Sequence, residues 1–72
     1  MIGSYIFKRL ADKSAFVVFE KASYRTYVIQ TSFMFNFLMN KNIITSTDEF
    51  EALNYHNQIE LLAQSGIEEE LT

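Results

Sequence analysis

The sequence has no cysteine and a single histidine, His56. These scarcities exclude disulfide bridges, thiolate zinc sites and an imidazole metal cluster, which are the usual supports of so short a chain. The 72 residues suffice for one small domain only. Stability must therefore come from packing of apolar side chains, which supply 49% of the sequence.

Catalytic and phosphate-binding motifs are also missing. A serine nucleophile would have to rely on His56, and no Gly-x-Ser-x-Gly segment is present. The two glycines, Gly3 and Gly66, lie too far apart in the chain to form a phosphate-binding loop. Acids on the water-exposed face of a helix are ordinary and need no catalytic role. We expect a protein that is not an enzyme, with no catalytic residue, no metal site and no cofactor.

Long apolar runs are absent as well. The longest apolar-looking stretch, residues 28–39, is interrupted by polar residues and is shorter than the ~20 residues of a membrane-spanning helix. The N-terminus lacks the basic start, long apolar run and cleavage site of a signal peptide. Together with the absence of cysteine, this composition predicts a soluble, cytoplasmic protein with no membrane span.

No basic residue follows Lys41. The first 41 residues contain six basic residues and two acids, a net charge of +4, whereas the remainder has seven acids and a charge of −7. These seven acids are Asp48, Glu49, Glu51, Glu60, Glu68, Glu69 and Glu70. Either the two poles neutralise one another within the fold or across a dimer, or one pole is a docking surface.

Three short segments rich in aromatic and β-branched residues predict a three-stranded antiparallel meander, at about residues 5–10, 15–21 and 24–30. The connections lack the Asn-Gly or Asp-Gly pair of a tight hairpin, and the first segment would also suit a short helix. The middle segment is apolar on both faces. Helices or a second copy of the sheet must therefore cover both sides of it.

A first helix is predicted at about residues 33–41, with Thr31 or Ser32 as its N-cap. Its apolar side chains point in nearly all directions, and only a narrow strip around Asn36 and Asn40 is polar. A helix of this kind is normally buried, and a chain of this length has few places to bury it.

A second helix is predicted at about residues 47–64. Ser46 and Glu49 match the capping box that begins a helix, and Gly66 is placed to end it with a left-handed cap. Helical periodicity predicts a core stripe on this helix, made up of Ala52, Tyr55, Ile59, Leu62 and Ala63. A smaller apolar cluster lies on the other side, formed by Phe50, Leu53 and Leu61.

The predicted architecture is therefore α+β: a single small domain at residues 1–66, in which two helices follow the meander. Residues 67–72 form an acidic tail with two apolar residues. We expect this tail to be flexible, or else to serve as a short linear docking segment.

The surplus of apolar surface predicts a protein-interaction role. A homodimer would absorb the surplus most simply, and a foreign partner could do so equally well. We expect a small non-enzymatic protein that binds and modulates or occludes a protein partner with a basic surface. Phe50, Leu53 and Leu61 would form the apolar centre of the contact, surrounded by the seven acids. The proline-free, Asn- and Ile-rich composition further suggests a phage or mobile-element inhibitor of a host defence protein.

Two alternatives stay open. Aromatic and basic residues alternate along the predicted strands, as in sheets that bind single-stranded nucleic acid. They are Tyr5, Phe7, Tyr24 and Tyr27, with Lys8, Arg9, Lys21 and Arg25. The seven acids oppose phosphate binding. The other alternative is a purely structural homodimerisation module that binds nothing else.

Overall fold

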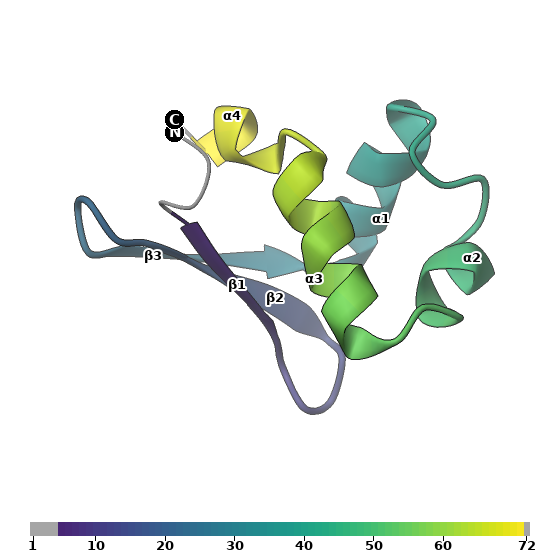
Figure 1. The fold of residues 1–72 in the computed structure, drawn as a ribbon, viewed down its shortest axis with the longest axis horizontal. Coiled ribbons are helices and arrows are strands. Elements are labelled where there is room, and N and C mark those ends of the chain that lie inside the picture. The colour runs from purple at the N-terminus through teal and green to yellow at the C-terminus, as the bar shows by residue number, and fades with distance from the viewer. Residues whose placement is uncertain (1–4, 72) are drawn as a thin grey trace.

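The computed structural model describes residues 5–71 as a three-stranded antiparallel sheet followed by four helices (Figure 1). The strands are β1 (Tyr5–Arg9), β2 (Ala15–Glu20) and β3 (Arg25–Gln30), and the helices are α1 (Thr31–Asn40), α2 (Thr47–Glu51), α3 (Tyr55–Gln64) and α4 (Ile67–Leu71). The predicted α+β meander is confirmed. The first four residues of the predicted domain and Thr72 of the predicted tail lie outside the described residues.

The strands lie in the order β1-β2-β3, so each hairpin pairs neighbours in the sequence. In place of glycine, Lys13 and Tyr24 take the left-handed backbone conformation in the two connections, with φ of 63° and 60°. L-residues with a side chain rarely adopt it. The left-handed conformation of these two residues lets the chain reverse direction without an Asn-Gly or Asp-Gly pair.

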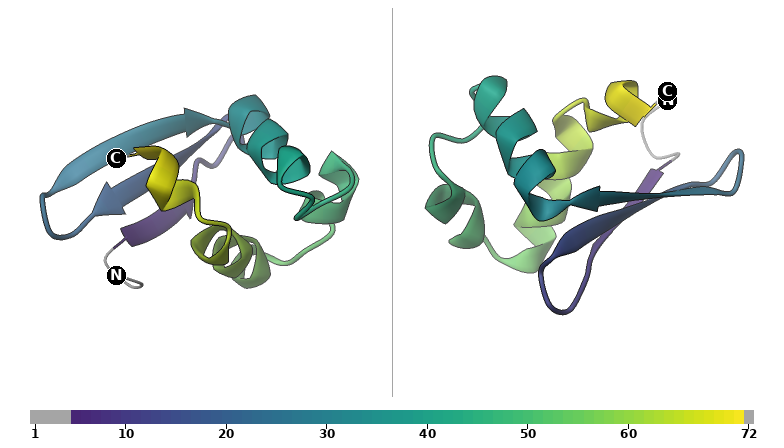
Figure 2. Two further views of the ribbon diagram at one scale, coloured as in Figure 1. Left: turned by 90° about the horizontal axis from the view of Figure 1, so that it is seen from above. Right: turned by 180° about the vertical axis from the view of Figure 1, so that it is seen from behind.

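All four helices lie on one side of the sheet (Figure 2). Side chains from every helix meet the inward side chains of the strands in one core. The fully buried members with the largest side chains are Phe16, Phe50, Met34, Leu38, Leu62, Ile67 and Val18. The Phe50 ring meets those of Phe16 and Phe35 edge-on, with centroids 6.0 and 5.3 Å apart. Such aromatic pairs stabilise beyond the area they bury.

Helix α1 begins two residues earlier than predicted. Its N-cap is Gln30, which makes no side-chain capping bond, so the predicted cap at Thr31 or Ser32 is wrong. The Thr31 hydroxyl instead donates to the backbone carbonyl of Lys13 at 2.6 Å. The hydroxyl thus ties the β3–α1 junction to the β1–β2 connection.

The predicted second helix is two helices, because the chain turns at residues 52–54. Asn54 caps α3 by accepting the N–H of Asn57 at 2.8 Å. The Gln58 amide donates to the carbonyls of Leu53 and Phe50, at 3.0 and 3.3 Å, and so satisfies groups that a continuous helix would have paired internally. The short Asn54 side chain, which accepts the backbone N–H of Asn57, favours a helix start over a helix interior.

The break changes the predicted core stripe. Of its members only Leu62 is fully buried, Ile59 and Ala63 are half-buried, and Ala52 and Tyr55 are exposed.

The start of α2 follows the prediction in part. Ser46 accepts the N–H of Glu49, but the Glu49 carboxylate binds the N–H of Thr45 rather than that of Ser46.

The end of α3 agrees with the prediction, since Gly66 follows its last turn with φ of 82°. The next residues are not a frayed tail, because Ile67–Leu71 forms α4 and Ile67 is fully buried. Ile67 in the core and Leu71 packed against it hold this segment against the domain.

Candidate functional site

The outer face of the sheet is an apolar surface that the described helices leave uncovered. Side chains alternate along each strand, so the strands send their other set of residues to this side. We call this set the open-face patch; it consists of Ile6, Val17, Phe19, Tyr24 and Val28, with Leu10 and Phe33 at its margins. Ile6 is 50% exposed and Val28 is 68% exposed.

Register brings the members of the patch together. Ile6 lies opposite Phe19 and Val17 lies opposite Val28 across the two ladders. The Phe19 and Tyr24 rings lie 6.2 Å apart in a tilted arrangement, and Tyr24 is 81% exposed at a backbone position that bulky residues rarely adopt. An exposed aromatic held in a strained turn is a feature of binding sites more than of ordinary surfaces.

The patch carries little charge. Lys8 is the sole ionisable residue among the strand positions that face outward. A shallow hollow of about 310 Å³ lies at the margin, lined by Val28, Ile29, Gln30 and Phe33. Depletion of charge with exposed aromatic side chains is the composition that marks the centre of protein interfaces.

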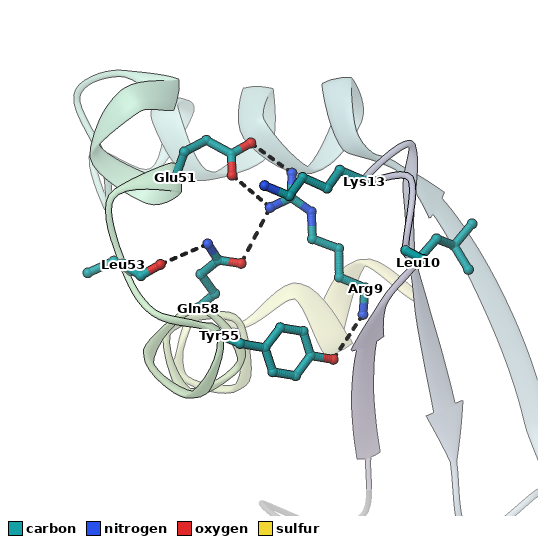
Figure 3. Close-up of a pocket in the computed structure, with 8 residues that line it drawn as sticks. Arg9, Leu10, Lys13, Glu51, Leu53, Tyr55 and Gln58 are labelled. Carbon is teal, nitrogen blue, oxygen red and sulfur yellow. Dashed lines mark hydrogen bonds and ion pairs between the residues drawn. The ribbon is translucent and has the colours of Figure 1, made fainter.

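A second feature, on the helix side, is a buried arginine. The Arg9 side chain is only 4% exposed, and its guanidinium lies 5.0, 5.7 and 5.9 Å from the rings of Phe16, Phe50 and Phe35. It donates to both carboxylate oxygens of Glu51 at 2.8 Å (Figure 3). Aromatic faces and a two-point carboxylate contact together make burial of this charge tolerable.

Two further residues complete the arginine cluster. The Gln58 side-chain oxygen accepts from Arg9 at 3.4 Å, and the Tyr55 hydroxyl accepts the Arg9 backbone N–H at 3.2 Å. A pocket of about 370 Å³ lies beside the cluster, and Lys13 also lines it. The hydrogen bonds from Arg9 hold the pKa of Glu51 below its usual range, and the charges of Arg9 and Lys13 act in the same direction.

This cluster is a structural joint more than a reactive site. A carboxylate that already binds a guanidinium through both oxygens is a poor general base. The contacts join β1 to the last residue of α2 and to the first two turns of α3. We therefore assign Arg9, Glu51 and Gln58 to the assembly of the fold.

The structure does not bring the predicted contact residues together at the surface. Phe50 is fully buried in the core, and Leu53 and Leu61 are half-buried, so the predicted apolar centre on the second helix is wrong. The physical reason is the break after α2, which lets Phe50 contact the sheet instead of following the outer side of a longer helix.

The predicted acids lie in the helical layer. Glu51 is bound to Arg9 and Glu68 is half-buried, while the others are exposed on their helices: Asp48, Glu49, Glu60, Glu69 and Glu70. The pKa of Glu49 is lowered, because its carboxylate accepts the backbone N–H and the hydroxyl of Thr45.

The alternating row of aromatic and basic residues does not form one surface either. Phe7 and Arg9 are buried beneath the helices, and Tyr5 and Tyr27 face the same side of the sheet. Only Tyr24 of the four aromatic residues is exposed. These residues therefore do not form one continuous row of exposed rings and cations in this fold.

Within residues 5–71, no three or more His, Cys, Asp or Glu side chains gather in a way that could hold a metal ion. His56 is exposed on α3. None of the described helices has the length and apolar character needed to cross a membrane.

The open-face patch was not assigned as a site from the sequence. The signal was present in the two apolar faces of β2, which indicated a need for cover on both sides. Alternation alone cannot say which face the helices take. Comparison with protein-family models, curated proteins and solved structures gives no match for this chain.

Proposed function

We propose that this chain is a non-enzymatic protein-binding domain that docks a protein partner on the open-face patch and occludes the surface it covers. The observation that carries this proposal is the one-sided cover of the sheet. The helices cover one face of the sheet, and Ile6, Val28 and Phe33 on or beside the other face remain at least half exposed. Apolar surface left in water costs about 25 cal/mol per Å², so its retention favours a binding role.

The chemistry of the patch defines the partner it suits. The centre is apolar and Lys8 is the charge on it, so a matching surface is apolar and places an acid opposite Lys8. The exposed acids of the helices lie on the other layer of the molecule. They can steer the approach of a basic partner without forming the centre of the contact.

The size of the face limits the strength of one such contact. Three strands of about five residues cover roughly 17 by 14 Å, from 3.3 Å per residue and 4.8 Å between strands. This area is smaller than the ~800 Å² that each side of a standard interface buries. A single patch therefore supports a weak or transient complex.

The first test compares two variants that add the same charge at different places. Ile6→Glu places a carboxylate in the patch, and Gln64→Glu places one at an exposed position of α3. We expect proteins captured by the tagged wild-type chain to be retained by Gln64→Glu and lost with Ile6→Glu, by at least about tenfold. Circular dichroism should show the same fold for all three.

Two outcomes contradict the proposal. Capture that survives Ile6→Glu would show that the patch is not the docking surface. Capture that disappears after nuclease treatment would show nucleic acid as the ligand.

A further inference from the structure

The sheet has two edges, and the helices protect only one of them. On β1 the outward N–H of Arg9 donates to the Tyr55 hydroxyl of α3 at 3.2 Å. The same strand carries the exposed charge of Lys8. A capped backbone group and charged side chains are devices that keep an edge strand from pairing with another chain.

The register shows which backbone groups of β3 face outward. The Leu10 N–H donates to the Ala15 carbonyl, and antiparallel pairs alternate from that point between bonded and non-bonded positions. Because the same alternation continues from β2 to β3, the backbone N–H and C=O groups of Tyr27 and Ile29 point toward β2. Thr26 and Val28 therefore direct their N–H and C=O groups away from the sheet.

These outward groups have no partner within the described part of the chain. Neither the N–H nor the C=O of Thr26 or Val28 takes part in a hydrogen bond among residues 5–71. The segment from Thr26 to Gln30 contains no charge and no proline, and its pairing with β2 has no bulge. Beyond Arg25 at its start, β3 therefore carries no charge and no capped backbone group of the kind found on β1.

We infer that the free edge of β3 pairs antiparallel with β3 of a second copy of this chain, joining the two sheets into one. With a two-fold axis at Val28, this residue lies opposite the partner's Val28. The same register places Thr26 opposite the partner's Gln30 and Tyr27 opposite the partner's Ile29. In this arrangement the outward groups of Val28 exchange both hydrogen bonds with their symmetry mates.

The side chains of β3 are complementary to themselves in this register. Valine meets valine, a hydroxyl meets an amide, and an aromatic ring meets a β-branched residue, all of which are favourable cross-strand pairs. Arg25 lies opposite the partner's Thr31, so no like charges face one another across the axis. This absence of repulsion favours a second copy over a segment of unrelated sequence as the occupant.

The pairing does not depend on the proposed function but would strengthen it. A two-fold axis perpendicular to the sheet keeps both outer faces on the same side. The two open-face patches, which meet at the two Val28 side chains, would then form one continuous surface. Its area would be twice that of the single face, about 480 Å², which brings it closer to the ~800 Å² that each side of a standard interface buries.

Hydrogen exchange of the wild-type chain tests the register directly. We expect sedimentation to show a dimer whose population falls on dilution. At high concentration the amides of Thr26 and Val28 should exchange about tenfold or more slowly than in the dilute monomer, since both become hydrogen-bonded donors. The Arg9 amide, already bonded to Tyr55, should change little.

A matched pair of variants tests the edge. Thr26→Pro removes the outward N–H and adds a ring at the edge; its side chain lies on the outer face opposite Phe19, while every residue of the open-face patch is kept. Thr26→Val keeps both the N–H and a β-branched side chain. We expect Thr26→Pro to weaken dimerisation by at least about tenfold and Thr26→Val to retain it.

The Ile6→Glu variant separates this inference from the proposed function, because it alters the patch and leaves the β3 edge intact. Loss of partner capture with the dimer retained would support both. A dimer that Ile6→Glu dissociates and Thr26→Pro does not would overturn the edge pairing. A chain that stays monomeric at millimolar concentration, or equal exchange of the Thr26 and Val28 amides at all concentrations, would also overturn it. If Thr26→Pro fails to fold, exchange in the wild type decides alone.

Discussion

At the scale of single residues, Arg9 shows how far burial can depart from residue type. In the sequence it is one of several cations among aromatic residues on a strand. In the fold its guanidinium is enclosed by three phenylalanine rings and bound by Glu51. Only the arginine of this pair is buried, since the Glu51 side chain is 36% exposed. Removing Glu51 leaves the buried charge of Arg9 uncompensated, which is more costly than losing a pair between two exposed side chains.

Glu51 gives this joint a predictable pH dependence. Its folded-state pKa is lowered from 4.5, so its contribution to stability is present above pH 4.5 and is lost as the pH falls through the lower folded value. We expect Glu51→Gln to lower the free energy of unfolding by about 2 kcal/mol at pH 7, measured by urea denaturation. The difference from wild type should shrink as the pH falls below 4.5.

Glu60→Gln is the control, because Glu60 is exposed on α3. We expect it to change stability by less than about 0.5 kcal/mol at pH 7. A Glu51→Gln effect that is the same at pH 7 and pH 3 would show that the charge on Glu51 does not stabilise the fold.

At the scale of elements, the break between α2 and α3 decides which side chains reach the core. Helical periodicity continues across it, since Ala52, Tyr55 and Ile59 keep the spacing of one stripe. Asn54 nevertheless starts a new helix, and Gln58 satisfies the carbonyls left at the turn. The interruption lets Phe50 point into the core instead of lying on the outside of a longer helix.

Substitution of Asn54 distinguishes two helices from one by the sign of its effect. At an N-cap, Asn54→Ala should destabilise the protein by about 1 kcal/mol, because the N–H of Asn57 loses its acceptor. In a continuous helix the same change would stabilise, since alanine has the highest helix propensity. Asn57→Ala, at an exposed position within α3, is the control and should be neutral or slightly stabilising in thermal unfolding.

At the scale of the whole molecule, one layer of helices covers one face of a small sheet. Within residues 5–71, the buried apolar side chains of the helices pack against that face of the sheet, and no helix or strand covers the outer face. The exposed acids lie in the helical layer, while Lys8 lies on the outer face of the sheet. The acidic pole seen in the sequence thus corresponds to the helical layer, whereas Lys8 is the one basic residue among the outward strand positions.

A comparison of two phenylalanines tests this division into inside and outside. Phe50 is fully buried, whereas Phe33 is 54% exposed beside the open-face patch. We expect Phe50→Ala to cost about 3–5 kcal/mol in urea denaturation and Phe33→Ala less than about 1 kcal/mol. Similar losses from both substitutions would contradict the placement of Phe50 in the core and Phe33 at the surface.

The regular elements could be predicted because their signals are local. Alternation and β-branched residues mark the three strands, Ser46 marks the start of α2, and Gly66 marks the end of α3. The predicted contact residues failed for a different reason. Phe50 was placed with Leu53 and Leu61 by the geometry of an uninterrupted helix, and one turn of the chain removed that geometry.

The sequence by itself determined the α+β class, the meander that precedes the helices, the uneven distribution of charge and the two apolar faces of β2. Only the tertiary structure decided which of those faces is covered, that Arg9 and Phe50 are buried, and that β1 is capped while β3 is free. The physical reason is that periodicity records how side chains alternate along a segment. Which face is buried depends on helices that come later in the chain, and therefore on contacts between residues far apart in the sequence.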